Sequence, residues 1–142
     1  IVIALAAIGF ILLEVPLKGG DPPPNLDPRV HFAVVCGALG CPPLLPRVYR
    51  ADSLEIQLEF ATRNALALPR HLAFTKTGQL QGSAIFLWYT RDFGGIEKAF
   101  EFAMKYAPAK IRAEVKQRKV TGLAGTVPWD WNLNQTVHKK EI

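Results

Sequence analysis

The sequence predicts an α+β fold: a small mixed sheet whose interior strand carries His31, packed by two or three amphipathic helices. Two patterns indicate it. Apolar residues recur at helical spacing in two stretches, and short apolar runs bounded by Gly and Pro are typical of strands. The chain has 142 residues, of which 49% are hydrophobic and 20% are charged. These values suit one domain with an ordinary core and exclude a disordered tail.

The chain divides into three parts. Residues 1–17 begin with thirteen consecutive apolar residues, fewer than the ~18–20 that cross a bilayer core. We expect this segment to be either a buried element of the core or the remnant of a membrane anchor. Residues 18–26 contain Gly-Gly and Pro-Pro-Pro, which break regular structure and predict a loop. Residues 27–142 are then expected to form a single globular domain.

The first element of this domain is predicted over residues 29–36. The run RVHFAVVC is β-branched and apolar on both faces, as in an interior strand that is buried on both sides. This interpretation places His31 inside the protein. A tight loop is predicted over residues 36–43, because Gly37 and Gly40 allow the chain to reverse.

A helix is predicted between Asp52 and Pro69. Asp52 followed by Glu55 resembles a capping box, and Pro69 supplies the stop. The residues expected to face inward recur at alternating spacings of four and three: Leu54, Leu58, Ala61, Ala65 and Leu68.

The remaining elements alternate between short strands and helices. Residues 71–80 predict a hairpin around a Thr-Gly turn, and Ser83 is expected to cap a short helix over residues 84–91, with a strand there as the alternative. Another amphipathic helix follows Gly94-Gly95, and Pro108 suits the first turn of a further helix with Ile111 and Val115 inward. Residues 120–134 predict a strand and an ordered loop. The inward face of the helix after Gly95 is expected to carry Ile96, Phe100, Ala103 and Ala107.

Three segments together resemble the domain-of-unknown-function 547 family. They read DPRVHFAVVCG at residues 27–37 with CPPL at 41–44, IFLWY at 85–89 with DFG at 92–94, and WDWNLN at 129–134. Members of this family normally carry an Asn/Tyr-rich helical motif before the first segment, which residues 1–26 do not match. They also usually have Tyr where Trp129 stands. The resemblance implies a fold for residues 27–134 and leaves the activity open.

Cys36 and Cys41 are the candidate nucleophiles. A catalytic thiol needs a nearby imidazolium or helix N-terminus to lower its pKa. His31 is the candidate base, with Asp130 or Asn132 to orient it. On an extended strand His31 and Cys36 point to opposite faces, whereas Cys41 could fold back beside the strand. This arrangement would make the protein a cysteine hydrolase or acyltransferase.

The two cysteines have other interpretations. Free Cys is among the most buried residue types, and a Cys36–Cys41 disulfide would require an oxidising compartment. A zinc site is the weakest of these interpretations, because one Cys-x4-Cys pair with scattered His31, His71 and His138 lacks a second ligand pair. No Gly-rich nucleotide loop is present in the sequence, so we predict neither a metal nor a cofactor.

The preferred function is a protein- or peptide-binding module, in which residues 27–29 and the Trp-Asp-Trp loop at 129–131 shape a groove near His31 and the cysteines. Both hypotheses require the cysteine hairpin to lie next to Asp130.

A carboxylate among aromatic rings could serve in proton transfer. Asp92 and Asp130 are expected instead to cap turns or pair with Arg29 or Arg91. The candidate binding residues are Arg29, Trp88, Asp92 and Trp131.

The net charge of +5 comes mainly from residues 97–119, which contain seven Lys and Arg but only three Asp and Glu. Without a recognisable nucleic-acid-binding motif, this stretch predicts a solvated helical face and no nucleic-acid partner. Contact with an anionic membrane is the alternative, and it would fit a membrane anchor in the N-terminal apolar run and a location outside the cytoplasm or at a membrane. The residues that could share this face are Lys105, Arg112, Lys116 and Lys119.

Overall fold

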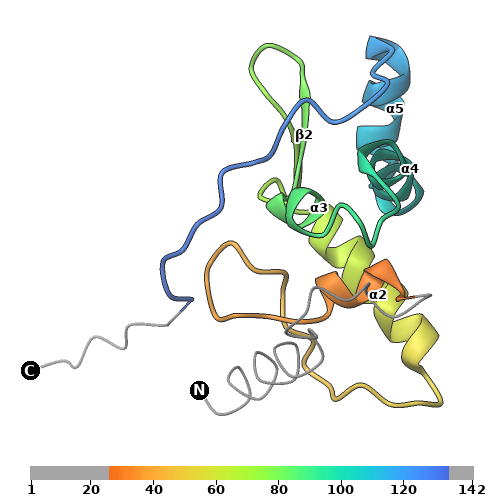
Figure 1. Cartoon of the computed structure of the whole chain (residues 1–142), viewed down its shortest axis with the longest axis vertical. Helices are drawn as coiled ribbons and strands as arrows, with labels where there is room; N and C mark the ends of the chain where they lie inside the picture. Colours follow the sequence, from red (N-terminus) through yellow and green to blue (C-terminus); the bar gives the residue numbers. More distant parts are fainter. Residues whose placement is uncertain (1–25, 135–142) are drawn as a thin grey trace, which may run out of the picture.

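The computed structural model describes residues 26–134, and within them it confirms an α+β fold (Figure 1). The sheet is smaller than predicted and is not mixed, because it consists of two antiparallel strands. The predictions for residues 1–17, for the loop up to residue 25 and for His138 lie outside the described residues. In chain order the elements are the 3-10 helix η1 (Pro28–Phe32), α2 (Leu54–Leu66), β1 (Leu72–Phe74), β2 (Leu80–Gly82), α3 (Ala84–Trp88), α4 (Ile96–Tyr106) and α5 (Ala109–Arg118).

The predicted interior strand that carries His31 is wrong, since this segment forms η1. The carboxylate of Asp27 accepts a hydrogen bond from the Arg29 N–H at 2.9 Å, and Pro28 occupies the first turn with its φ already near the helical value. These two residues favour a helical turn, and their effect outweighs the β-propensity of the apolar residues that follow. η1 packs against α2, and Phe32 is fully buried between them and the rest of the core.

α2 confirms the predicted amphipathic helix, although it begins after Ser53. Asp52 does not cap it: its carboxylate accepts hydrogen bonds from Arg50 and Ser53 instead. The buried face of α2 follows the predicted spacing at Leu58, Ala61 and Ala65, whereas Leu54 is exposed and Leu68 lies after the end of the helix. The helix ends before Pro69 as expected. Its buried residues are Leu58, Ala61, Thr62, Ala65 and Leu66.

The predicted hairpin is confirmed, with Leu72 opposite Gly82 and Phe74 opposite Leu80. Gly78 makes the turn with a φ of 82°, a value that favours glycine. Ser83 then caps α3 by accepting a hydrogen bond from the Ile85 N–H at 3.3 Å. The capped helix was predicted to reach residue 91 and ends at Trp88.

α4 and α5 follow as predicted, and the inward face of α4 is rotated slightly from the expected one. Ala99, Ala103 and Tyr106 are its buried residues, whereas Ile96 is exposed. α5 has no fully buried residue, and it contacts the core through half-buried side chains such as Val115.

The strand predicted within residues 120–134 does not form. This segment crosses the molecule in extended conformation from the end of α5 to the loop that follows η1 (Figure 1). It makes only single bridges, from Thr126 to Gly82 and from Leu133 to Ala38. It therefore connects the helical side of the domain to the side where the cysteines lie.

The core is built around four phenylalanines from different parts of the chain. The ring centroids of Phe32 and Phe86 are 5.6 Å apart, and the Phe93 ring lies 5.0 Å from both Phe86 and Phe102. Aromatic pairs at these separations add about 0.5–1.5 kcal/mol beyond the area they bury. The cluster fixes η1, α3 and α4 relative to one another.

Candidate functional site

The three tryptophans of the chain contact one another on one side of the domain. We call Trp88, Trp129 and Trp131 the tryptophan surface. The Trp88 centroid lies 4.8 Å from that of Trp129 and 5.8 Å from that of Trp131, and Trp129 and Trp131 are 5.9 Å apart. Trp88 stands at the end of α3, and the other two belong to the extended C-terminal segment. Trp131 is 69% exposed and Trp88 is 48% exposed, so much of this aromatic area faces water.

The cysteine loop, residues 36–41, is hydrogen-bonded to the segment that carries Trp129 and Trp131. Its Leu39 N–H donates to the Asn132 carbonyl and its Gly40 N–H donates to the Asp130 carbonyl, both at 2.8 Å. The Asn134 N–H returns a hydrogen bond to the Gly37 carbonyl at 2.8 Å. The cysteine loop therefore lies next to Asp130, as the sequence predicted.

Gly40 is placed where this pairing leaves no room for a side chain. A Cβ there would lie 2.8 Å from Cδ2 of Trp129 and 2.9 Å from the backbone nitrogen of Asp130. Contacts below 3.0 Å require a neighbour to move, and here the neighbours are an indole and a backbone atom. The absence of a side chain at Gly40 lets the two segments approach each other.

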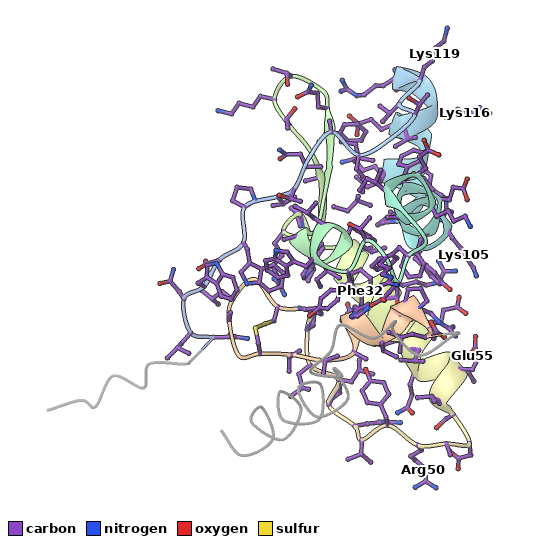
Figure 2. All side chains as sticks on the ribbon, in the orientation of Figure 1. Phe32, Arg50, Glu55, Lys105, Lys116 and Lys119 are labelled. Atoms are coloured by element: carbon purple, nitrogen blue, oxygen red, sulfur yellow. A yellow bond between two sulfur atoms is a disulfide. The ribbon has the colours of Figure 1, made fainter. Side chains whose placement is uncertain are left out.

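Cys36 and Cys41 form a disulfide that closes the loop. Figure 2 shows this bond in yellow beside the C-terminal segment. The backbone N–H of Cys36 also donates a hydrogen bond to Sγ of Cys41 at 3.1 Å. Because both sulfurs are bonded to each other, neither is a thiolate nucleophile in this structure.

Asp130 and Asn132, the predicted orienting residues, interact mainly with each other. Oδ1 of Asp130 accepts hydrogen bonds from the Asn132 backbone N–H at 2.9 Å and from its side-chain amide at 2.7 Å. Such contacts are typical of an aspartate that shapes its own turn. They stabilise the turn of the Trp-Asp-Trp loop.

His31 is paired with Asp92, which is 61 positions away in the sequence. Nε2 of His31 and Oδ2 of Asp92 are 2.8 Å apart, and the imidazole stacks on Tyr89 at 3.9 Å between centroids. Burial lowers the pKa of His31, against the opposing effect of the Asp92 carboxylate. A neutral His31 can donate its Nε2–H to Asp92. The pair thus links η1 to the turn after α3, while the cysteine loop makes its contacts with residues 130–134.

A second buried histidine, His71, lies beside the tryptophan surface and was missed as a site residue. It is fully buried, its Nδ1 is 3.2 Å from Oγ of Ser83, and its ring centroid is 6.4 Å from that of Trp129. Burial and the positive charge of Arg70 lower the pKa of His71 to about 4, although the backbone of Cys41 acts in the opposite direction. No pattern in the sequence signals this contact, because the partners come from separate loops and strands.

Arg29, a predicted binding residue, is held between two carboxylates. Its guanidinium donates to Asp27 and also to Glu55 at 2.6 and 2.7 Å, and these hydrogen bonds raise the pKa of Arg29. The same contacts lower the pKa of both carboxyl groups. A cavity of about 270 Å³ adjoins this cluster, and Lys105 and Tyr106 line it as well. Arg29 therefore joins η1 to α2, where Figure 2 labels its partner Glu55.

The basic residues predicted to share a face are exposed on α4 and α5. Figure 2 shows Lys105, Lys116 and Lys119 pointing outward along that side. Arg112 donates instead to the Ala107 carbonyl at the preceding turn. Among residues 26–134, no helix is both long and apolar enough to span a membrane, and no group of three or more His, Cys, Asp or Glu side chains could hold a metal ion.

Comparisons with known proteins give a match at the level of a family model. No curated protein matches this chain. No solved structure matches it either. The family match covers less than a third of the chain and ends before the segments at residues 85–94 and 129–134. Residues 23–65 match the model of the family described as "Protein of unknown function, DUF547", which confirms the predicted resemblance over η1, the cysteine loop and most of α2.

Proposed function

We propose that this domain is a protein- or peptide-binding module and that the tryptophan surface is its contact site. The observation that carries the proposal is the exposure of Trp88 and Trp131 at 48% and 69% while their rings remain in contact. Clustered exposed apolar side chains mark interaction sites, and Trp is enriched among the residues that dominate binding energy. Two large rings kept in water at one place are most simply explained by a partner that covers them.

The neighbouring side chains indicate the chemistry of this partner. Leu39 and Leu133 are both exposed, and the backbone pairing of the cysteine loop with residues 130–134 keeps them close to Trp131. The site therefore combines aromatic and aliphatic surface, with the polar Asp130 and Asn132 in the same loop. Such a composition suits a peptide segment that inserts one or two large apolar side chains.

The way in which the surface is supported also favours binding. Three backbone hydrogen bonds and the disulfide hold the cysteine loop and the Trp-Asp-Trp loop in place before any partner arrives. A site that is already ordered loses less conformational entropy when it binds. The local contacts of Asp130 with Asn132 act in the same way.

Arg29 and Asp92 fall outside the proposed contact site, although the sequence suggested them as binding residues. Each is engaged with a buried or half-buried partner inside the domain, Arg29 with Asp27 and Asp92 with His31. A cysteine hydrolase would need Cys36 or Cys41 as a free thiolate near His31. In the oxidised protein neither sulfur is a free thiolate, and His31 is engaged with Asp92, which favours the binding module over the hydrolase.

The proposal can be tested by selecting peptides on the folded domain from a random display library and measuring their affinity by calorimetry. We expect the selected peptides to contain large apolar residues. Trp131→Ala and Trp88→Ala should each weaken binding at least tenfold, because each removes an exposed indole. Ile56→Ala is the matched control, since Ile56 is a largely exposed apolar residue on α2. Unchanged affinity in both tryptophan variants would exclude this surface as the site.

A further inference from the structure

The two halves of the disulfide differ in their access to solvent. Cys36 is an exposed residue, whereas Cys41 is only 6% exposed. Thiol–disulfide exchange proceeds by attack of an external thiolate on one sulfur while the other leaves, and access decides which sulfur is attacked. The asymmetry therefore favours attack at Cys36 and departure of Cys41.

The structure also provides a group that stabilises the leaving sulfur. The backbone N–H of Cys36 donates to Sγ of Cys41 at 3.1 Å. A hydrogen bond to sulfur favours the charged thiolate, and a more stable leaving thiolate departs faster. This donor belongs to the residue that is attacked, so it remains in place as the bond breaks.

Backbone hydrogen bonds hold the loop in addition to the disulfide. The backbone hydrogen bonds from Leu39 and Gly40 to residues 130–134, and from Asn134 to Gly37, do not involve either sulfur. Gly37 adopts a φ of 85° with no atom within 4 Å of its would-be Cβ. After reduction the two sulfurs should therefore remain neighbours, which makes the reverse reaction effectively intramolecular.

From these observations we infer that the Cys36–Cys41 disulfide is a redox-active site that exchanges with external thiols through Cys36. A thiolate attacks Sγ of Cys36 and forms a mixed disulfide, and the electron pair of the old S–S bond leaves on Sγ of Cys41. A second thiolate attacks the external sulfur of the mixed disulfide and releases Cys36 as a thiolate. Two thiols are thus oxidised to one disulfide, and the cysteine pair is reduced. An external disulfide reverses both steps. This inference does not depend on the tryptophan surface.

Two single-cysteine variants test the direction of attack. Cys41→Ser leaves the exposed Cys36, and Cys36→Ser leaves the buried Cys41. Each full-length variant is incubated with oxidised glutathione, and the adduct is followed by mass spectrometry. We expect Cys36 to form its adduct at least tenfold faster than Cys41. Equal rates, or a faster reaction at Cys41, would overturn the assignment.

The wild-type chain provides a second measurement that does not depend on how the variants fold. Its disulfide is reduced with glutathione, and the rate is compared with that of an oxidised linear peptide containing residues 34–43. A redox-active site should react at least as fast as the peptide, and the glutathione adduct trapped by alkylation should map to Cys36. A rate tenfold below that of the peptide would identify a protected structural disulfide and refute the inference.

Discussion

The domain contains two aromatic clusters that are similar in ring geometry and opposite in environment. In the core, neighbouring phenylalanine centroids are 5.0–6.4 Å apart and the side chains Phe32 and Phe86 are fully buried. At the tryptophan surface the centroids are 4.8–5.9 Å apart, yet Trp131 is largely exposed. Ring contact alone therefore does not distinguish a cluster that stabilises the fold from one that is available to a partner.

What differs is the source of order in the two regions. Side-chain burial between η1, α3 and α4 holds the core, so its stability depends on the apolar area removed from water. Backbone hydrogen bonds and a disulfide hold the loops of the tryptophan surface, so the exposed side chains of Trp88 and Trp131 contribute little to its order. Substitutions should therefore lower the free energy of unfolding in the first region and alter binding in the second.

The largest loss of stability is expected for Phe86→Ala in the core. Phe86 contacts Phe32, Phe93 and Phe102, and its removal would leave a cavity. Such truncations lower the free energy of unfolding by about 3–5 kcal/mol. Denaturant unfolding followed by circular dichroism measures it. Phe60→Ala is the control, because Phe60 is exposed on α2 and should change stability by less than ~0.5 kcal/mol. Equal losses in both variants would mean that the core does not depend on ring burial.

The next largest effect is a loss of stability in acid caused by His71. Its pKa is about 4 in the folded protein and 6.5 in the unfolded chain, so the unfolded state binds more protons between these values. The contribution of His71 is fully present above pH ~6.5 and is lost as the pH falls, by about 3 kcal/mol at pH 4. Burial lowers the pKa of His31 as well, which adds a loss in the same direction.

The variant His71→Gln isolates this contribution. We expect the free energy of unfolding of the variant to fall less steeply than that of the wild type between pH 6.5 and pH 4, when both are measured by urea titration at several pH values. Parallel curves for the two proteins would show that His71 is not the group responsible.

A smaller loss is expected for Gly40→Ala, which tests the join between the two regions. The new Cβ would collide with Trp129 and with the backbone of Asp130. Overpacking of this kind lowers stability by about 1–3 kcal/mol, and the displaced loop should also weaken peptide binding. Gly122→Ala is the matched control, because nothing lies within 4 Å of its would-be Cβ. Thermal unfolding of both variants measures the difference. If they unfold at the same temperature, the close approach at Gly40 is not needed for the stability of the domain.

The smallest change in stability is expected for Trp131→Ala. Because this side chain is already largely exposed, its truncation should shift the free energy of unfolding by no more than ~0.5 kcal/mol. The same variant is expected to lose peptide affinity at least tenfold, so it separates binding from stability. A large loss of stability would assign Trp131 to the structure of the domain instead.

The sequence predicted the long helices because their pattern is local. In α2 and α4 the apolar residues recur at helical spacing, and the stops and turns are marked by Pro69, Gly94 and Gly95. The strand at residues 29–36 was predicted wrongly because a short apolar run reads alike in a buried strand and a buried helix. There the cap formed by Asp27 and Pro28 decided the outcome.

The candidate site was predictable only where its residues are close in sequence. The disulfide and the Trp-Asp-Trp loop could be proposed from motifs, and their contact confirms the predicted neighbourhood. The pairs His31–Asp92 and His71–Ser83 depend on tertiary packing. Nothing in the local sequence around His71 indicates that Ser83 and Trp129 will surround it.

The placement of all three tryptophans in one surface gives the protein a built-in optical reporter. The aromatic core contains phenylalanine and tyrosine, so ultraviolet emission excited near the indole band arises only from Trp88, Trp129 and Trp131. Emission from the exposed Trp88 and Trp131 would therefore report on the face that we assign to the partner, while Trp129, which packs against the core, would report on the join between that face and the interior. Local rearrangement at that face can thus be followed in the unlabelled protein, separately from the melting of the whole domain.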